Sequence, residues 1–295
     1  MSIADLANRA AAMVDQTQTK AAGDYDYTPP AAGLTYGRFI EYIELGKQPQ
    51  RPYQGKPKPD CEEVRITFEL LNPKRDIREI EVDGGTKKIA DRISVRVPIK
   101  LSDKAQFVKL FRKMTYGRDA IKHMAQMLGE PFLITIVHNT SAKDPNKVYA
   151  NIRDADGNWL IGPPRHVDPL TGESKDISKL IPAELSPQRI FIWDMPDKEQ
   201  WSSLYIDGTR TVTRDGKEVE VSKNWIQEVI LGAKNFPGSP LAALLSGTDQ
   251  LSIDPETPTG TGAQAALDAL SQDTAGDTST ADDLSALGLD DEIPF

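Results

Sequence analysis

Apolar and polar residues alternate along two stretches of the chain, residues 64–70 and 93–101. A period of two places successive side chains on opposite faces of a strand, so both stretches are predicted to be half-buried strands. Pro98 interrupts the second stretch. Because proline has no amide hydrogen to donate, we expect this strand to lie at a sheet edge or to carry a bulge.

Shorter strand signals surround these two stretches, and several are joined by turn dipeptides. Asp83-Gly84, Asp156-Gly157 and Asp215-Gly216 are typical of tight hairpin turns. Residues 165–179 are polar and rich in turn formers, which predicts a surface loop. The pattern thus predicts further strands at residues 38–45, 77–82, 132–137, 148–153, 159–161 and 189–193, and a hairpin at 209–222.

Helical periodicity is confined to short segments. Two helices are predicted between the strands at 93–101 and 132–137: one at residues 103–114, with Asp103 and Gln106 at capping-box spacing, and one at residues 119–129. A helix near the amino terminus, at residues 2–14, and a last helix from Asn224 to a stop at Gly232 complete the set. We therefore expect a mainly β fold with a two-helix insertion and a terminal helix.

Composition divides the chain into three parts. Residues 1–33 hold the terminal helix and a polar connector, residues 34–245 hold the predicted β-rich domain, and residues 246–295 are rich in Gly, Thr, Ser, Asp and Ala. The run at residues 236–240, Phe-Pro-Gly-Ser-Pro, is predicted to end the folded body. The last part contains almost no aromatic residues to bury, so we expect a disordered tail.

Charge is segregated along the chain in the same way. The net charge is -9, but residues 246–295 hold eleven of the 44 acidic residues and none of the 35 basic ones. This leaves 33 acidic residues against 35 basic ones, a charge of +2, on residues 1–245. The sequence therefore describes a nearly neutral body with an anionic tail.

Several function classes are disfavoured. The single cysteine, Cys61, cannot form an intramolecular disulfide, and the three histidines lack metal-ligand spacing, so no metal or cofactor is expected. The chain has neither a P-loop nor a Gly-x-Ser-x-Gly motif, and we expect no enzymatic activity. A magnesium-dependent nuclease using Asp154, Asp156 and Asp194 is the enzymatic alternative. No stretch is apolar enough to span a membrane and no leader is evident, which predicts a cytoplasmic protein without membrane contact.

The end of the chain has the chemistry of a docking peptide. An aromatic ring with a terminal carboxylate can enter a small apolar pocket beside a basic residue, while proline lowers the entropy lost on binding. The preceding acidic residues supply electrostatic steering. The predicted partner-binding tip consists of Asp290, Asp291, Glu292, Ile293, Pro294 and Phe295.

This ending resembles the acidic carboxy-terminal tip of bacterial and phage single-stranded DNA-binding proteins, in which several aspartates precede Ile-Pro-Phe. Glu292 departs from the commoner aspartate but keeps the charge. The resemblance implies that the tip recruits replication, recombination and repair proteins and can contact the protein's own DNA-binding face. Because the body carries +2 and the tail eleven acidic residues, we expect the tail to compete with DNA at low salt.

The body resembles a group of tailed-phage proteins predicted to bind single-stranded DNA. The resemblance lies in residues 36–46, 132–139 and 225–241 and spans most of residues 34–245. It implies sequence-non-specific binding and protection of single-stranded DNA during phage replication and recombination, in the host cytoplasm. An elaborated barrel like the oligonucleotide-binding (OB) fold accommodates a helical insertion between its third and fourth strands.

Loops and strand faces supply the candidate DNA contacts. Non-specific binding of single-stranded DNA needs cations along the path of the DNA backbone and aromatic rings on which the bases stack. The loop between the first two strands, the loop at residues 139–147 and the polar strand faces together provide Tyr36, Arg38, Tyr42, Lys47, Arg51, Tyr53, Lys56, Lys58, Arg65, Arg96, Lys100, Lys143, Lys147 and Tyr149.

Two other functions fit the same pattern. A virion or scaffolding protein could also combine a β-rich body with an acidic tail, although assembly gives no reason for an Asp-Asp-Glu-Ile-Pro-Phe terminus. A recombination mediator that binds DNA only weakly would share the tail. The sequence leaves the oligomeric state open, and a homo-oligomer is compatible with it.

Overall fold

The computed structural model describes residues 28–50, 52, 55–82, 85–140, 148–214 and 217–247. Two compact units are distinguished: a hairpin unit at Gly208–Lys223, and a larger unit that contains the described residues of 29–207 and 224–247. The predicted helix at residues 2–14 and the tail from residue 248 onward lie outside the described residues. In the part of the chain that is described, no helix is long and apolar enough to cross a membrane.

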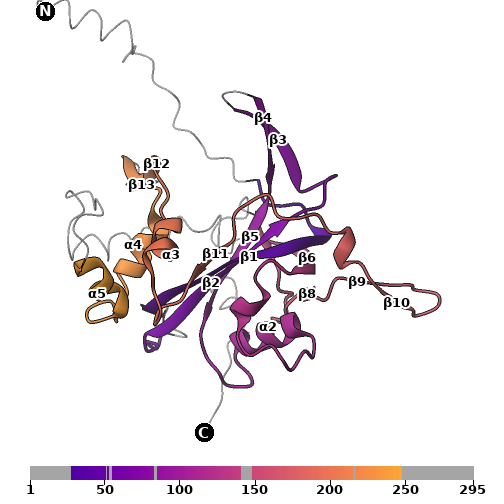
Figure 1. Ribbon diagram of the computed structural model, residues 1–295, viewed down its shortest axis with the longest axis horizontal. Coiled ribbons are helices and arrows are strands. Elements are labelled where there is room, and N and C mark those ends of the chain that lie inside the picture. The colour runs from indigo at the N-terminus through magenta and orange to yellow at the C-terminus, as the bar shows by residue number, and fades with distance from the viewer. Residues whose placement is uncertain are drawn as a thin grey trace, which may run out of the picture. The chain divides into compact units, whose positions relative to one another are not determined.

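A curled sheet forms the centre of the larger unit (Figure 1). Its strands run in the order β5-β2-β1-β6-β7, and each neighbouring pair is antiparallel. The mainly β prediction is confirmed, and so is the edge position predicted from Pro98, because β5 ends the order. The strands are β1 (Gly33–Gln48), β2 (Cys61–Leu70), β5 (Arg92–Pro98), β6 (Pro131–Thr140) and β7 (Val148–Asn151).

Strand β1 is long enough to pair with three partners. One edge pairs with β2 from Gly37 to Gln48, with two register shifts. The other edge is shared between β6, which pairs with Gly33 to Arg38, and the parallel strand β11 (Arg189–Phe191), which pairs with Glu41 to Ile43. A short strand, β8 (Ile161–Gly162), extends the outer edge of β6.

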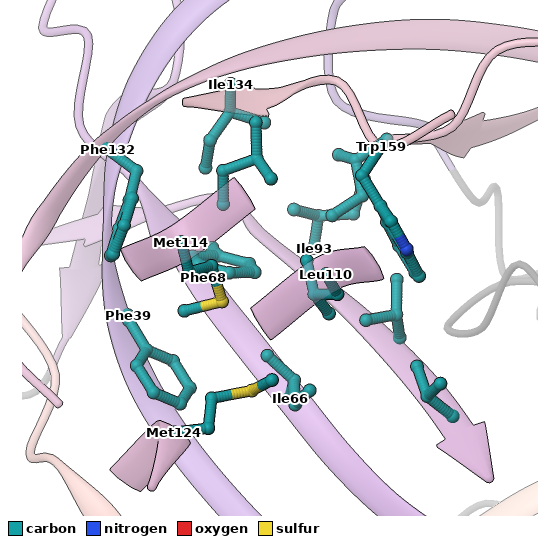
Figure 2. Close-up of a cluster of buried hydrophobic side chains, with 14 of the residues drawn as sticks. Phe39, Ile66, Phe68, Ile93, Leu110, Met114, Met124, Phe132, Ile134 and Trp159 are labelled. Atoms are coloured by element: carbon teal, nitrogen blue, oxygen red, sulfur yellow. The ribbon is translucent and has the colours of Figure 1, made fainter. Parts of the chain in front are cut away.

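The first hydrophobic core lies between one face of this sheet and the segments packed on it (Figure 2). Helix α2 (Gln106–Thr115) contributes Leu110 and Met114, which pack against Phe68 of β2 and Ile134 of β6. The helix contacts both β5 and β8, so it bridges strands at the two ends of the sheet. Trp159 fixes this position by donating its indole N–H to the carbonyl oxygen of Gln106 at 3.0 Å.

The second core lies on the opposite side of β1. Ile43 and Leu45 point into it, together with Phe191 of β11 and the indole rings of Trp193 and Trp201. The core is completed by α3 (Lys198–Ser203), α4 (Trp225–Leu231) and α5 (Pro240–Ser246). Because both sides of the central strands are covered, β2 is buried continuously from Val64 to Leu70, and the prediction of a half-buried strand was wrong.

Two helix predictions need correction. Residues 119–129 do not form an α-helix; they contain the 3₁₀ turn η1 (Met124–Met127), which His123 caps by accepting from the amide of Ala125. The predicted capping box of Asp103 is also absent, because the N-cap of α2 is Ala105. Asp103 instead accepts a hydrogen bond from Arg112.

The hairpin predictions were more accurate. Strands β3 (Ile77–Val82) and β4 (Gly85–Ala90) pair on either side of Asp83-Gly84, and β12 (Thr209–Arg214) pairs with β13 (Lys217–Ser222) in the hairpin unit. Strand β7 pairs with β6 rather than with residues 159–161, and a single bridge joins Arg153 to Trp159.

Two surface predictions differ from the structure. The expected loop at residues 165–179 contains the hairpin β9 (Arg165–Val167) and β10 (Ser174–Asp176), followed by the 3₁₀ turn η2 (Ser178–Leu180). The folded body continues past residues 236–240 into α5, whose Leu241 is fully buried.

Candidate nucleic-acid interface

Two of the predicted lysines lie on either side of the first residues of β2, Lys47 on β1 and Lys100 just after β5. Lys47 pairs with Glu62 across the two strands, and the amide of Ile99 donates to the carbonyl oxygen of Glu62 at 2.7 Å, so Glu62 lies between Lys47 and the segment that carries Lys100. Both side chains are exposed. Burial raises the pKa of the neighbouring Cys61 thiol, and the ammonium groups of Lys100 and Lys47 oppose this shift. The carboxylates of Glu63 and Glu62 act on the same thiol and raise its pKa, so both lysines lie near opposite charges.

Sequence reasoning missed a third lysine at this place. The amide of Lys234 donates to the carbonyl oxygen of Lys47 at 2.9 Å, and the amide of Lys47 donates to Oδ1 of Asn235 at 2.7 Å. Lys234 is exposed and is the last basic residue before the tail. The sequence could have pointed to Lys234, because no basic residue follows it and the acidic tail begins soon after.

Gly46 explains how the segment after α4 comes so close to β1. Its φ is +72°, and a Cβ at this position would overlap the ring of Trp193 and the Cβ of Ala233. Only glycine tolerates both the left-handed conformation and this close packing. The glycine thereby allows Lys47 and Lys234 to lie side by side. We call Lys47, Lys100 and Lys234 the lysine cluster.

The remaining loop candidates are only partly described. Lys56 is exposed and Lys58 is half-buried, and both lie in the segment that joins β1 to β2 next to the lysine cluster. Arg51 and Tyr53 of the same segment lie outside the described residues, as do Lys143, Lys147 and the tip residues Asp290, Asp291, Glu292, Ile293, Pro294 and Phe295.

Two predicted DNA contacts are contradicted by burial. Tyr42 is 1% exposed, packs edge-on against His123 at a centroid distance of 5.1 Å and donates its hydroxyl to Glu44. Arg65 is 6% exposed, lies 3.5 Å from Glu41 and stacks over Trp225 at 4.8 Å. Neither side chain can reach a base or a phosphate, because Tyr42 belongs to the first core and Arg65 lies on the other side of the sheet against Trp225 of the second core.

The guanidinium groups of Arg38 and Arg96 are hydrogen-bonded within the protein and link neighbouring segments of the fold. Arg38 donates to the carbonyl oxygens of Gly129, Ile181 and Pro182, which ties the segment before β11 to β1. Arg96 donates twice to Glu63 on the neighbouring strand. The half-buried positions of both side chains agree with this structural role.

The segment before β11, which contains Leu185 and Ser186, covers the face of β2 that points away from the first core. Glu69 is fully buried and accepts hydrogen bonds from the amide of Leu185 at 2.7 Å and from the hydroxyl of Ser186. Arg189 donates to Glu41, whose pKa burial alone would raise but the guanidinium groups of Arg65 and Arg189 hold below its ordinary value. The face expected to follow phosphates is thus an internal polar layer.

Tyr36 and Tyr149 are the described aromatic candidates that keep partial exposure. Tyr36 lies opposite Leu133 of β6, and Tyr149 lies opposite Asn139 of the same strand. Because Leu133 and Asn139 are six residues apart, they lie on one face of β6. Both tyrosines therefore lie on the face opposite the first core, into which Phe132, Ile134 and Ile136 of β6 point.

Nothing at the proposed nuclease aspartates indicates a metal site. Asp154 accepts from the amide and side chain of Asn158, which closes the hairpin turn. Among the described residues, no group of three His, Cys, Asp or Glu side chains could hold a metal ion. The turn accounts for Asp154 without catalysis.

Comparison of the chain with protein-family models, with curated proteins and with solved structures finds no match.

Proposed function

We propose that this protein binds single-stranded DNA without sequence preference, as a protecting protein of replication or recombination. The observation that carries the proposal is the lysine cluster, in which the amide of Lys234 donates to the carbonyl oxygen of Lys47, the amide of Lys47 donates to Asn235, and Lys100 follows the residue that hydrogen-bonds Glu62. Exposed ammonium groups on a fixed backbone suit the phosphates of a flexible DNA strand, because neutralising phosphates releases condensed counterions.

The arrangement of the sheet supports an elaborated OB-fold. The order β5-β2-β1-β6-β7 matches a barrel in which the first strand pairs with the second and the fourth, and α2 stands between the third and fourth. In this assignment the segment between β1 and β2 is one of the two loops that border the binding surface. The described strands give no pairing between β5 and β7 or β8, and α2 lies between these ends instead.

The proposed path begins at the lysine cluster and avoids the covered outer face of β2. Lys56 and Lys58 extend the cluster along the loop, and Tyr36 and Tyr149 are the aromatic rings that we assign to base stacking. Each stacked base contributes about 1–3 kcal/mol. The acidic tail carries the second part of the proposal: it competes with DNA for the lysines, and its Ile-Pro-Phe tip recruits replication or repair proteins.

Fluorescence anisotropy with labelled oligo-dT tests the proposal. We expect tight binding to the single strand, weak competition by duplex DNA, and a linear fall of log affinity with log salt. A chain truncated after Gly247 should bind more tightly than the full chain at low salt, because the competing carboxylates are gone.

Absence of binding at low salt by both the full chain and the truncated chain would reject the proposal. A virion or scaffolding role would then become the first candidate. Equal affinity of the two chains would reject only the competition by the tail, and DNA binding by the lysine cluster would stand.

A further inference from the structure

The hairpin β9–β10 forms an arm that extends away from the sheet (Figure 1). All six residues of its two strands are exposed. Val167 is 56% exposed, and Leu170 at the tip is 94% exposed. An exposed leucine is common on protein surfaces. An arm that holds two apolar side chains in water is a better candidate for a contact surface.

Hydrogen bonds hold the backbone at the tip of the arm in one turn conformation. Oδ1 of Asp168 accepts from the amides of Leu170 at 2.8 Å and Thr171 at 3.1 Å, and the amide of Asp168 donates to the carbonyl oxygen of Glu173 at 2.9 Å. Gly172 completes the turn with a φ of +73°. The turn thus fixes the backbone that carries Leu170, with Glu173 three residues further along the arm, so little backbone entropy is lost when the leucine is buried.

A pocket beside the carboxyl end of α2 has the complementary chemistry. Phe111 and Ile121 form its apolar lining, and Arg112, Arg118 and Lys122 supply cations. Asp119 is the carboxylate of the lining. Arg112 is engaged by Asp103 and Arg118 by Glu130, whereas Lys122 presents an exposed ammonium group. The pocket would therefore accept an apolar side chain flanked by a carboxylate.

We propose that the arm of one copy of this protein docks in the α2 pocket of a second copy, with Leu170 between Phe111 and Ile121 and with Glu173 beside Lys122. The contact joins two different surfaces, so each copy keeps a free arm or a free pocket after pairing. Copies then associate head to tail, as an open chain or as a closed ring. This inference does not depend on DNA binding.

The expected contact is small, because an arm tip and one pocket bury less surface than a stable dimer needs. Association of the free protein should accordingly be weak and reversible. Copies bound next to each other on one long ligand, such as a nucleic-acid strand, would be at a high effective concentration. This strengthens a weak contact without any new interaction. If the protein coats single-stranded DNA, the arm supplies cooperativity.

Sedimentation velocity of the full chain tests the contact, from low micromolar to the highest soluble concentration. We expect the weight-average sedimentation coefficient of the wild type to rise with concentration. Leu170→Asp should abolish the rise. Leu101→Asp is the matched control, because Leu101 is a 79% exposed leucine outside the arm and the pocket. This variant should associate like the wild type.

Charge reversal tests the pairing of the two surfaces. Glu173→Lys and Lys122→Glu should each weaken association, and the double variant should regain part of it, since the exchanged charges attract again. Mixing Leu170→Asp with Lys122→Glu gives the sharpest outcome. The Leu170→Asp variant keeps its pocket and the Lys122→Glu variant keeps its arm. The mixture should therefore form dimers and no larger head-to-tail assemblies.

Three results would overturn the proposal: a wild-type chain that stays monomeric at every concentration, a Leu170→Asp variant that associates like the wild type, or a mixture that fails to form dimers. Circular dichroism and thermal unfolding verify that the variants are folded. We expect no loss of stability in Leu170→Asp, because the side chain it replaces is in water.

Discussion

Glu41 of β1 lies between the guanidinium groups of Arg65 on β2 and Arg189 on β11, and Arg65 is 3.5 Å from its Oε2. Glu41 is 1% exposed and Arg65 is 6% exposed. A carboxylate in this position compensates two cations that the second core removes from water. The group of charges therefore joins three strands instead of serving a ligand.

Substitution of this carboxylate should be costly. Glu41→Gln leaves the cations of Arg65 and Arg189 uncompensated, and we expect the free energy of unfolding to fall by about 3–5 kcal/mol. Urea denaturation measures the change. The control is Glu79→Gln on β3, whose carboxylate forms an exposed pair with Lys88 at 3.8 Å and should contribute less than about 1 kcal/mol.

Glu41 should also make the free energy of unfolding depend on pH in the acidic range. The pKa of Glu41 is lower in the folded protein than its ordinary value of 4.5, so its contribution is fully present above that value. The contribution is lost as the pH falls through the folded pKa. Protonated glutamate resembles glutamine, and the difference in unfolding free energy between wild type and Glu41→Gln should shrink on acidification. A difference that stays constant down to pH values where the fold is lost would contradict this assignment.

The lysine cluster should control DNA affinity in proportion to its charge. Lys47→Ala, Lys100→Ala and Lys234→Ala should each weaken binding to oligo-dT and reduce the slope of log affinity against log salt by about 0.7. Lys198→Ala, on α3 and exposed, is the control and should leave the slope unchanged. Arg65→Met should also leave the slope unchanged, because the side chain is buried. Equal slopes in all four lysine variants would remove the cluster from the DNA path.

The close approach at Gly46 should tolerate no side chain. Gly46→Ala places a Cβ against the ring of Trp193 and enforces a left-handed backbone conformation on alanine. We expect destabilisation of more than about 1 kcal/mol, from the backbone conformation and from packing strain. Gly55→Ala is the matched control: its φ is +77°, but nothing lies within 4 Å of the added Cβ. Thermal unfolding should rank Gly46→Ala well below Gly55→Ala.

Helix α5 should be part of the folded body. Leu241 is fully buried in the second core, so Leu241→Ala should lower the unfolding free energy by about 2–5 kcal/mol. Ala243→Ser, at an exposed position of the same helix, should change it by less than about 0.5 kcal/mol. If both variants unfold like the wild type, the body ends before α5, as the sequence pattern alone had indicated.

Local chemistry was enough to predict much of the secondary structure. Alternation identified β2 and β5, Asp83-Gly84 and Asp215-Gly216 identified two hairpins, and Gly232 marked the end of α4. These features depend on residues that are neighbours in the chain, such as a turn dipeptide between two strands. The segregation of acidic residues into residues 246–295 is likewise a property of the sequence alone.

Only the tertiary structure decided which polar residues face water. Arg65 and Glu69 follow the same alternation as a solvent-exposed strand face, but residues more than a hundred positions away cover them, and Glu69 is capped by Leu185 and Ser186. Lys234 reaches Lys47 in the same way, across a sequence separation that no local period encodes. Alternation reports two faces of a strand without saying what packs on each, because burial depends on contacts between distant segments.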